Sequence, residues 1–495
     1  MARKSGLSTI EVSKRTSNRQ PAIVIESAYM GGIADSPYVG LANSLGSIVG
    51  FDLYTVPGLM LTAQKMTVEA NGAPTDDLYK IVTCSDGNIY LFGKTNGTVY
   101  KNASGTYTLL GTVAPATGAV GILDAIEFDG KLYYSMQNRL GQWDYTTAFS
   151  TRNDNFQTFA NGNATYHPML TILAVKTLYI GDGNNLAQWD NTTFVNNALV
   201  FTTDQVISAL GSQVTDLLIG TIVSNNVPRS WVHRWDTWSI TTSYNYPIPE
   251  VGVNAFLQAG DAEIIIQAGL SGNFYLLNGS IFQKQGKIPS NFPTLYSPTS
   301  QNQSFYPAVA VLDNIPLIGI SNVTGNPTYE GVYAFGAHAI NYPQVLTLPY
   351  PISTGNLSNV TIWSLAVQGN NLYVSWKDTT SGTVYGIDKL DYSNKYNGAF
   401  FETRIIKFSR IWLDNYNKIV IDYQTLPANT TINLSYDANW TGYIAYSGTD
   451  LFTDTDRNQI VGNLNPRAKT MRFKVSTTAS GNNAPAIEDL VILPT

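Results

Sequence analysis

Short apolar and aromatic runs alternate with clusters of Gly, Asn and Asp along most of the chain. Clear examples of such runs lie at residues 132–135, 178–181 and 217–220, and each is followed by a polar stretch and then by an aromatic segment. Val, Ile, Leu and Tyr fit a pleated sheet, whereas Gly, Asn and Asp favour chain reversals. Each passage therefore predicts a strand, a turn and a returning strand.

Three Trp-Asp pairs end these passages at a constant interval of 46 residues: Trp143-Asp144, Trp189-Asp190 and Trp235-Asp236. A constant period of this length indicates one structural unit copied along the chain, and it suits a four-stranded propeller blade. No Gly-His dipeptide precedes the pairs, so they are not full WD40 repeats. We expect each Trp to pack against the next blade and each Asp to cap the following turn.

The unit continues beyond these pairs in looser form. Apolar-aromatic anchors recur at positions 90, 133, 179, 218, 275, 333 and 373, with steps of 43, 46, 39, 57, 58 and 40 residues. Seven copies predict a seven-bladed propeller, while the two long steps leave six or eight blades open. Residues 22–26 are the candidate for an N-terminal strand that closes the ring. Residues 204–211 have helical character and predict a short helical turn between blades.

The pattern changes near residue 400. Polar and apolar residues alternate at 401–408, 418–423, 431–436 and 470–475. Such alternation is typical of antiparallel strands with one solvated face, and several of them in about 95 residues predict a β-sandwich. The predicted organisation is all-β, with an N-terminal basic arm and strand at 1–42, a propeller at 43–400 and a sandwich at 401–495.

Composition agrees with an all-β chain and narrows the function. Of the 495 residues only 13% are charged, whereas 12% are aromatic and 30 are Tyr. Abundant Tyr with few charges suits a protein that is buried in an assembly, although β proteins are often rich in Tyr. The net charge of −6 argues against a general nucleic-acid-coating role. No apolar run is long enough to cross a membrane, and no secretion signal is recognised.

The first twenty residues are the one basic segment. Arg3, Lys4, Lys14, Arg15 and Arg19 face a single acid, Glu11. One interpretation is a solvated tail. The other is an assembly arm that reaches a neighbouring subunit or nucleic acid, which makes these five basic residues candidate assembly contacts.

Trp231 and Trp238 are the candidate surface aromatics. Alternating positions 231, 233 and 235 would share one strand face, and an exposed row of rings could stack on sugars. Packing between blades is the competing interpretation, because the row coincides with a predicted blade strand. The single cysteine, Cys84, cannot form an internal disulfide.

No residue pattern points to a catalytic centre. Asp454, Asp456 and Asn458 have the spacing of a calcium loop, but Gln459 and Asn465 stand where Gly and Glu are needed, which favours a polar loop. The three histidines, at 167, 233 and 338, lack zinc-site spacing. Nucleophile-elbow, P-loop and dinucleotide motifs are absent. We expect a protein that is not an enzyme and has no cofactor or metal.

Four passages resemble propeller-bearing virion proteins of tailed bacteriophages, of the tail nozzle, hub or neck type. They are 31–36 with 51–53 and 57–58; 83–90; 233–236 with 273–279 and 287–289; and 472–475 with 490–493. The resemblance implies a ring of identical subunits, other tail or neck proteins as partners, and contact with nucleic acid only indirectly through a tail channel. It also implies a place in the virion tail after assembly in the host cytoplasm. The alternative is a carbohydrate-binding or glycoside-hydrolysing propeller that acts on a host-surface glycan.

Overall fold

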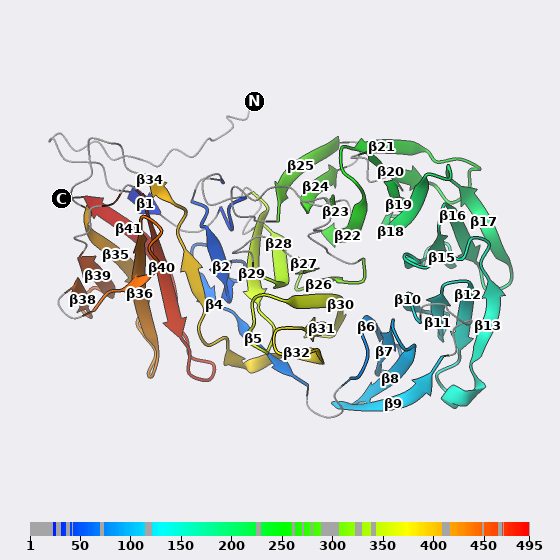
Figure 1. Cartoon of the computed structure of the whole chain (residues 1–495), viewed down its shortest axis with the longest axis horizontal. Coiled ribbons are helices and arrows are strands. Elements are labelled where there is room, and N and C mark those ends of the chain that lie inside the picture. Colours follow the sequence, from blue (N-terminus) through cyan, green and yellow to red (C-terminus); the bar gives the residue numbers. More distant parts are fainter. Residues whose placement is uncertain are drawn as a thin grey trace.

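The described chain folds into a β-propeller joined to a β-sandwich (Figure 1). The computed structural model describes residues 23–25, 31–35, 40–41, 43–69, 74–113, 121–223, 229–259, 263–269, 272–278, 281–288, 306–321, 329–337, 343–407, 416–447, 450–463, 468 and 470–494. Within these residues seven four-stranded antiparallel units surround a common axis, which confirms the all-β class and the seven-bladed propeller. No described helix is long and apolar enough to cross a membrane.

Six blades are built from consecutive strands, innermost first. Blade 1 contains β6 (Leu78–Thr83), β7 (Ile89–Gly93), β8 (Thr98–Ala103) and β9 (Thr106–Thr112). Blade 2 contains β10 (Asp124–Phe128), β11 (Lys131–Met136), β12 (Arg139–Trp143) and β13 (Asn153–Thr158). Blade 3 contains β14 (Met169–Ile172), β15 (Thr177–Asp182), β16 (Asn185–Trp189) and β17 (Phe194–Val200). Blade 4 contains β18 (Gln205–Gln213), β19 (Asp216–Val223), β20 (Ser230–Trp235) and β21 (Tyr244–Ile248).

Blades 5 and 6 follow the same plan. Blade 5 contains β22 (Val253–Ala259), β23 (Glu263–Ala268), β24 (Asn273–Asn278) and β25 (Ile281–Lys287). Blade 6 contains β26 (Val309–Leu312), β27 (Ile315–Ile320), β28 (Gly331–Gly336) and β29 (Val345–Tyr350). The anchors Tyr275 and Tyr333 lie in the third strands of these blades, whereas the other five anchors lie in second strands. This shift by one strand lengthens the step from 218 to 275 and shortens the step from 333 to 373. The 58-residue step from 275 to 333 joins equivalent strands, and it reflects the long connection between β25 and β26.

Blade 7 closes the ring with a strand from the N-terminal side. It contains β30 (Val360–Gln368), β31 (Asn371–Asp378), β32 (Val384–Lys395) and, as its outermost strand, β5 (Gln64–Val68), which pairs antiparallel with β32. The prediction that residues 22–26 close the ring is wrong, because β1 (Ile23–Ile25) pairs with β41 (Ala486–Pro494) in the sandwich. The chain therefore enters the sandwich first and crosses to the propeller afterwards.

One continuous sheet joins the propeller to the sandwich. The outer strand of blade 6 pairs with β2 (Ser47–Val49), and the sheet continues through β33 (Phe400–Glu402), β40 (Thr470–Thr478), β36 (Thr431–Ala438) and β37 (Ile444–Ala445). A short strand, β34 (Ile406–Lys407), also pairs with β40. The N-terminal domain boundary at residue 43 is therefore wrong, since residues 47–62 belong to the sandwich. Hydrogen bonds within this sheet hold the two parts as one body.

The second sandwich sheet packs against this one. Its order is β3 (Phe51–Asp52), β4 (Met60–Thr62), β41, β35 (Tyr416–Tyr423), β39 (Gln459–Asn463) and β38 (Leu451–Asp454). Buried side chains from both sheets form one core, including Phe51, Phe401 and Phe473. Phe51 and Phe401 make an edge-to-face contact with ring centroids 6.1 Å apart.

The expected helical turn at 204–211 is instead part of β18, the innermost strand of blade 4. Its apolar residues Ile207 and Ala209 are buried against neighbouring blades. A short apolar run has no reliable period, so burial within the sheet decides its structure.

Candidate functional site

The three blade tryptophans hold neighbouring blades together. Trp143 packs edge-on against Tyr90 of blade 1, with ring centroids 5.5 Å apart, and Trp235 packs against Tyr179 of blade 3 at 5.9 Å. Trp189 donates its Nε1–H to Tyr133 Oη of blade 2 at 3.1 Å. All three therefore contact the preceding blade, and the expectation of packing against the next blade is wrong.

The alternation of side chains along a strand explains why each Trp faces the preceding blade. Trp143 lies opposite Leu132 on β11, and both belong to the buried cluster shared with blade 1. Tyr133, one residue along, points to the other face and joins the cluster with Trp189 of blade 3. Side chains at successive positions of a strand face opposite sides, so the parity of the Trp position fixes which neighbour it meets.

The paired aspartates cap turns, as expected. Asp144 Oδ1 accepts the backbone N–H of Thr146 at 3.0 Å, and Asp190 Oδ1 accepts that of Thr192 at 2.8 Å. Asp236 Oδ1 accepts the N–H groups of Trp238 and Ser239 at 3.0 and 2.8 Å. Hydrogen bonds to the ionised form lower the pKa of all three carboxyl groups. These acids are structural and remain charged.

Aromatic side chains meet at the propeller axis. Tyr79 on β6 contacts Tyr306, which precedes β26, with ring centroids 5.9 Å apart. It also contacts Trp363 on β30, with ring centroids 5.6 Å apart. Tyr306 Oη donates a hydrogen bond to the Leu123 carbonyl, which joins the start of blade 6 to blade 2. Contacts between blades that are not neighbours can form only across the axis. The Tyr306 side chain therefore links the start of blade 6 to blades 1 and 2 across the axis.

A buried carboxylate supports the same inner wall. Asp124 is fully buried, and its Oδ1 lies 3.0 Å from Lys80 Nζ of blade 1. Its other oxygen accepts the Met169 N–H of blade 3 at 2.8 Å. Burial raises the pKa of Asp124, and the neighbouring Lys80 opposes that shift. One side chain thus ties together the innermost strands of three blades.

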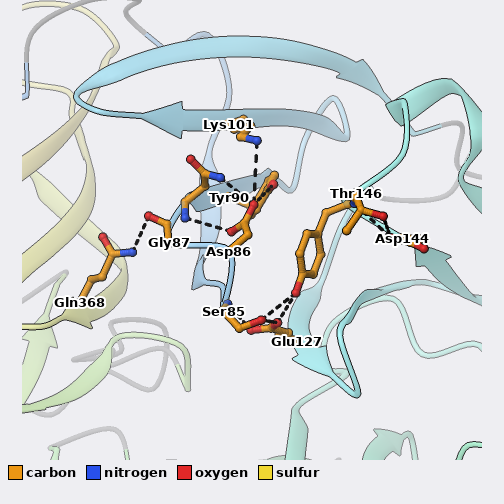
Figure 2. A network of polar contacts seen from close by, with 11 residues as sticks. Ser85, Asp86, Gly87, Tyr90, Lys101, Glu127, Asp144, Thr146 and Gln368 are labelled. Atoms are coloured by element: carbon orange, nitrogen blue, oxygen red, sulfur yellow. Dashed lines mark hydrogen bonds and ion pairs between the residues drawn. The ribbon is translucent and has the colours of Figure 1, made fainter.

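A polar network links three blades at one rim of the propeller (Figure 2). Ser85 Oγ and Tyr145 Oη both donate to Glu127 Oε1 at 2.5 Å, and Ser85 N–H donates to Glu127 Oε2 at 2.9 Å. Burial, together with the Glu127 hydrogen bond, raises the pKa of Tyr145 to about 12. Gln368 of blade 7 donates its Nε2–H to the Gly87 carbonyl at 2.9 Å.

Asp86 forms the second half of this network. It accepts hydrogen bonds from Tyr90 Oη at 2.8 Å and from the Asn88 N–H at 2.9 Å, and Lys101 Nζ lies 3.9 Å away. Burial opposes ionisation of Asp86, but the hydrogen bonds from Asn88 and Tyr90, with Lys101, together lower its pKa. Sequence reasoning missed this network, because its members come from separate repeats.

The described contacts of the network link blades, and none of them joins Ser85 to a histidine. Ser85 would need a general base with a pKa near the working pH to act as a nucleophile. Its described partners are a carboxylate and a phenol, and the two described histidines, His167 and His233, belong to blades 3 and 4. The contacts of Glu127 and Asp86 instead tie strand ends together.

The structure separates the two candidate surface aromatics. Trp231 is half-buried on β20 and stacks on His233, with ring centroids 6.2 Å apart. His233 in turn contacts Phe201 of the preceding β17–β18 connection at 4.5 Å. Trp238 lies in the β20–β21 turn and is exposed. Packing between blades therefore accounts for positions 233 and 235, and Trp231 stacks beside them on the same strand. Of the two candidates, Trp238 is the exposed one.

The remaining sequence candidates bring no metal-binding group together within the described residues. Arg3, Lys4, Lys14, Arg15, Arg19 and His338 lie outside the described residues. Asp454 Oδ1 accepts the N–H groups of Asp456 and Arg457, so this segment is a capped polar turn. No described group of three or more His, Cys, Asp or Glu side chains could hold a metal ion. Cys84 is buried, and burial raises the pKa of its thiol.

The sandwich carries an open polar groove that the sequence did not indicate. Its volume is about 580 Å³, and Asp422, Tyr423, Arg457 and Glu488 contribute to its walls. Burial raises the pKa of Asp422, and the nearby charge of Asp489 adds to the shift.

No protein-family model matches the sequence. No curated protein matches it either. Solved structures share the general architecture at low identity. U3-55K aligns with a TM-score of 0.48 at 14% identity, over 66% of this chain and 98% of that one. The streptogramin B lyase structure aligns with a TM-score of 0.46 at 10% identity, over 66% of this chain and 98% of that one.

A third structure covers more of this chain. It is the extracellular domain of the BT4673 hybrid two component system from B. thetaiotaomicron, with a TM-score of 0.46 and 16% identity over 79% of this chain. This chain spans 44% of the length of that structure. The propeller assignment rests on the strand order of the chain itself.

Proposed function

We propose that the chain is a structural protein of a tailed-bacteriophage virion, which forms a ring of identical subunits in the tail or neck, such as a nozzle or hub. In this role it is not an enzyme and needs no cofactor. It would be assembled in the host cytoplasm and would contact other tail or neck proteins. The sequence resemblance described above motivates this proposal.

The continuous sheet from blade 6 into the sandwich is the observation that supports it best. Val49 of β2 pairs with Leu348 of the blade and Phe400 of the sandwich, so no loose linker separates the two parts at this junction. A rigid body with two unlike ends suits repeated head-to-tail packing in a ring. The contacts that join blades across the axis and the use of acids in turns also suit a scaffold.

Electron microscopy and sedimentation of the purified chain test this proposal. We expect closed rings with a single rotational symmetry, and the protein should be present in purified virions as detected by mass spectrometry. A stable monomer at micromolar concentration that is also absent from virions would reject it.

Carbohydrate binding is the second candidate, because Trp238 and Tyr244 are both exposed on the β20–β21 hairpin. Exposed rings can stack on sugar faces, and host-surface glycans would be the natural ligands in a tail protein. A glycan array with the parent chain and a Trp238→Ala variant separates the candidates. Glycan binding that depends on Trp238 would favour this second function.

A further inference from the structure

Four strongly exposed apolar side chains lie on one rim of blades 3 and 4. They are Leu173 (81% exposed), Val214 (74%), Trp238 (83%) and Ile240 (93%), which we call the hairpin patch. Leu173 and Val214 lie in turns between first and second strands, and the other two lie between the third and fourth strands of blade 4. In an antiparallel blade these turns occupy the same end, so the four residues share one rim.

Adjacent contacts confirm that the two blades meet at this rim. Trp235, which ends β20 just before the turn, packs on Tyr179 of blade 3. Burial raises the pKa of Tyr179 overall, and the nearby side chain of Thr237, the residue beside Trp238, opposes that shift. The turn of blade 4 is therefore held against blade 3 while Trp238 and Ile240 point into solvent.

The other blades provide internal comparisons for the patch. Trp238 occupies the turn position that Thr146 and Thr192 occupy in blades 2 and 3, since each is two residues after the capping Asp. Val214 occupies the hairpin position of Asp129, Asp313 and Gly369. Equivalent turns thus fold with small or polar residues, so turn formation does not require the apolar ones.

Val214 also adopts an unfavourable backbone conformation. Its φ is +58°, in the left-handed region, and that of Thr237 is +69°. β-branched residues rarely adopt this region, and such strain concentrates at functional sites. At the equivalent position of blade 7, Gly369 has the same φ of +58° without that strain. An exposed apolar side chain that is kept in spite of a strained backbone indicates a contact surface.

We infer that the hairpin patch binds the N-terminal arm, residues 1–22, of a neighbouring copy of this chain. The inference rests on the proposed ring and names its contact. The arm carries five basic residues and one acid, a net charge of +4, so the rest of the −6 chain carries −10. The arm also contains Leu7, Ile10 and Val12, which can cover apolar side chains.

The acids beside the patch, which outnumber the exposed Lys176 of the Leu173 turn, complement the arm. Asp190 and Asp236 end the neighbouring blade strands at the same rim, and hydrogen bonds lower the pKa of both, which keeps them ionised. Asp129 is exposed at the same rim in the turn between β10 and β11 of blade 2. Opposite charges around an apolar centre accelerate association and fix its register.

The positions of the two partners favour binding between copies. β1, which follows the arm directly, lies at the sandwich end, and blades 3 and 4 lie at the opposite end of the molecule (Figure 1). Fully extended, the 22 residues of the arm span at most about 75 Å, which sets how far the arm can reach from β1 to a neighbouring copy. Contact between unlike ends of successive copies is heterologous, and it produces a ring when the rotation closes.

The test measures assembly of the full chain by mass photometry. We expect the double variant Val214→Gly/Trp238→Thr, which copies residues of other blades, to weaken assembly at least about 30-fold and to remain folded. A variant with all five arm basic residues changed to Gln should behave alike, and a synthetic peptide of residues 1–22 should dissolve the rings. Leu109→Thr, an exposed change on β9, is the matched control and should assemble like the parent.

The outcomes separate this inference from the proposed function. Rings that survive the patch and arm variants would overturn the inference and leave the function standing. The inference would also be overturned if the patch variant loses its rings while the arm variant keeps them and the peptide does not compete. That result would mean that the hairpin patch binds the folded surface of a second copy and not its arm. If the parent is monomeric but the labelled peptide binds it and not the patch variant, the contact is supported and the ring is rejected. Binding of a glycan in place of the peptide would overturn the inference.

Discussion

The indole N–H of Trp189 donates a hydrogen bond to Tyr133 Oη across the boundary between blades 2 and 3. Tyr133 is fully buried, and its hydroxyl also accepts a 2.7 Å hydrogen bond from Gln142 Nε2. One hydroxyl group thus satisfies donors from two blades. Trp143 and Trp235 make ring contacts at the corresponding boundaries but no such hydrogen bond to the preceding blade.

Removing this hydroxyl should destabilise the propeller. A Tyr133→Phe change leaves the buried Trp189 N–H without its acceptor, and we expect it to lower the free energy of unfolding by about 1–3 kcal/mol. Urea unfolding measures the change. In a double-mutant cycle with Trp189→Phe, the two changes should be less than additive. Strict additivity would show that the two groups do not interact.

The packing of Trp143 should be worth more than any exposed ring. We expect Trp143→Ala to cost about 3–5 kcal/mol, because it leaves a cavity between blades 1 and 2. Trp238→Ala is the matched control, since it removes the same side chain from an exposed turn and should change stability by less than about 0.5 kcal/mol. Equal losses in chemical unfolding would contradict the burial difference.

Stability should also depend on pH through His167. This ring is fully buried against Phe159, with ring centroids 4.7 Å apart, and burial lowers its pKa from 6.5 to about 3. Between these values the unfolded chain binds a proton that the folded chain does not. Stability from this residue is therefore complete above about pH 6.5 and is lost as the pH falls, with a slope of up to about 1.4 kcal/mol per pH unit.

The comparison with a His167→Phe variant isolates this contribution. Burial raises the pKa of the nearby Asp182 carboxyl, so the folded chain binds this proton more readily than the unfolded chain. The contribution of Asp182 to stability therefore increases as the pH falls, which opposes the effect of His167. We therefore expect the difference between parent and variant, measured by urea unfolding from pH 7 to 4, to change with pH. Proton NMR of the folded parent should show no titration of this histidine above pH 4, and a titration near pH 6.5 would contradict the prediction.

Local patterns were enough to predict the blades, because strands and turns repeat with a period that is visible in the residues themselves. Non-local pairings were not visible. Residues 22–26 and 64–68 are both plausible short strands, but their partners lie more than 300 residues away in β41 and β32. The order in which the N-terminal strands visit sandwich and propeller follows from three-dimensional packing that no local period encodes.

The candidate site was predictable only in part. The turn-capping role of Asp144, Asp190 and Asp236 followed from local chemistry, whereas the direction of the tryptophans depended on how the blades stack. Trp231 and Trp238 look alike in sequence, yet one lies on a strand that faces a neighbouring blade and the other lies in a turn. The Ser85–Glu127–Tyr145 contact joins two blades, so neither repeat alone signals it.

Closure by β5 gives the final prediction. Met66 is buried in the core of blade 7 with Leu365 and Leu390, whereas Val68 on the same strand is exposed. We expect Met66→Ala to lower the free energy of unfolding by about 2–5 kcal/mol, and Val68→Ala to change it by less than about 0.5 kcal/mol.

Hydrogen exchange locates the effect. A closing strand covers the outer edge of β32, so weakening it should expose the backbone of β32 before that of blade 3 on the far side. Faster exchange confined to blade 7 and its neighbours in Met66→Ala would support closure at this point. Uniformly faster exchange in all seven blades would instead mean that the ring opens only by global unfolding. The remaining contacts between blades 1 and 7 would then hold the ring closed without β5. One of them is the hydrogen bond that Ser375 Oγ donates to the Leu78 carbonyl at 2.7 Å.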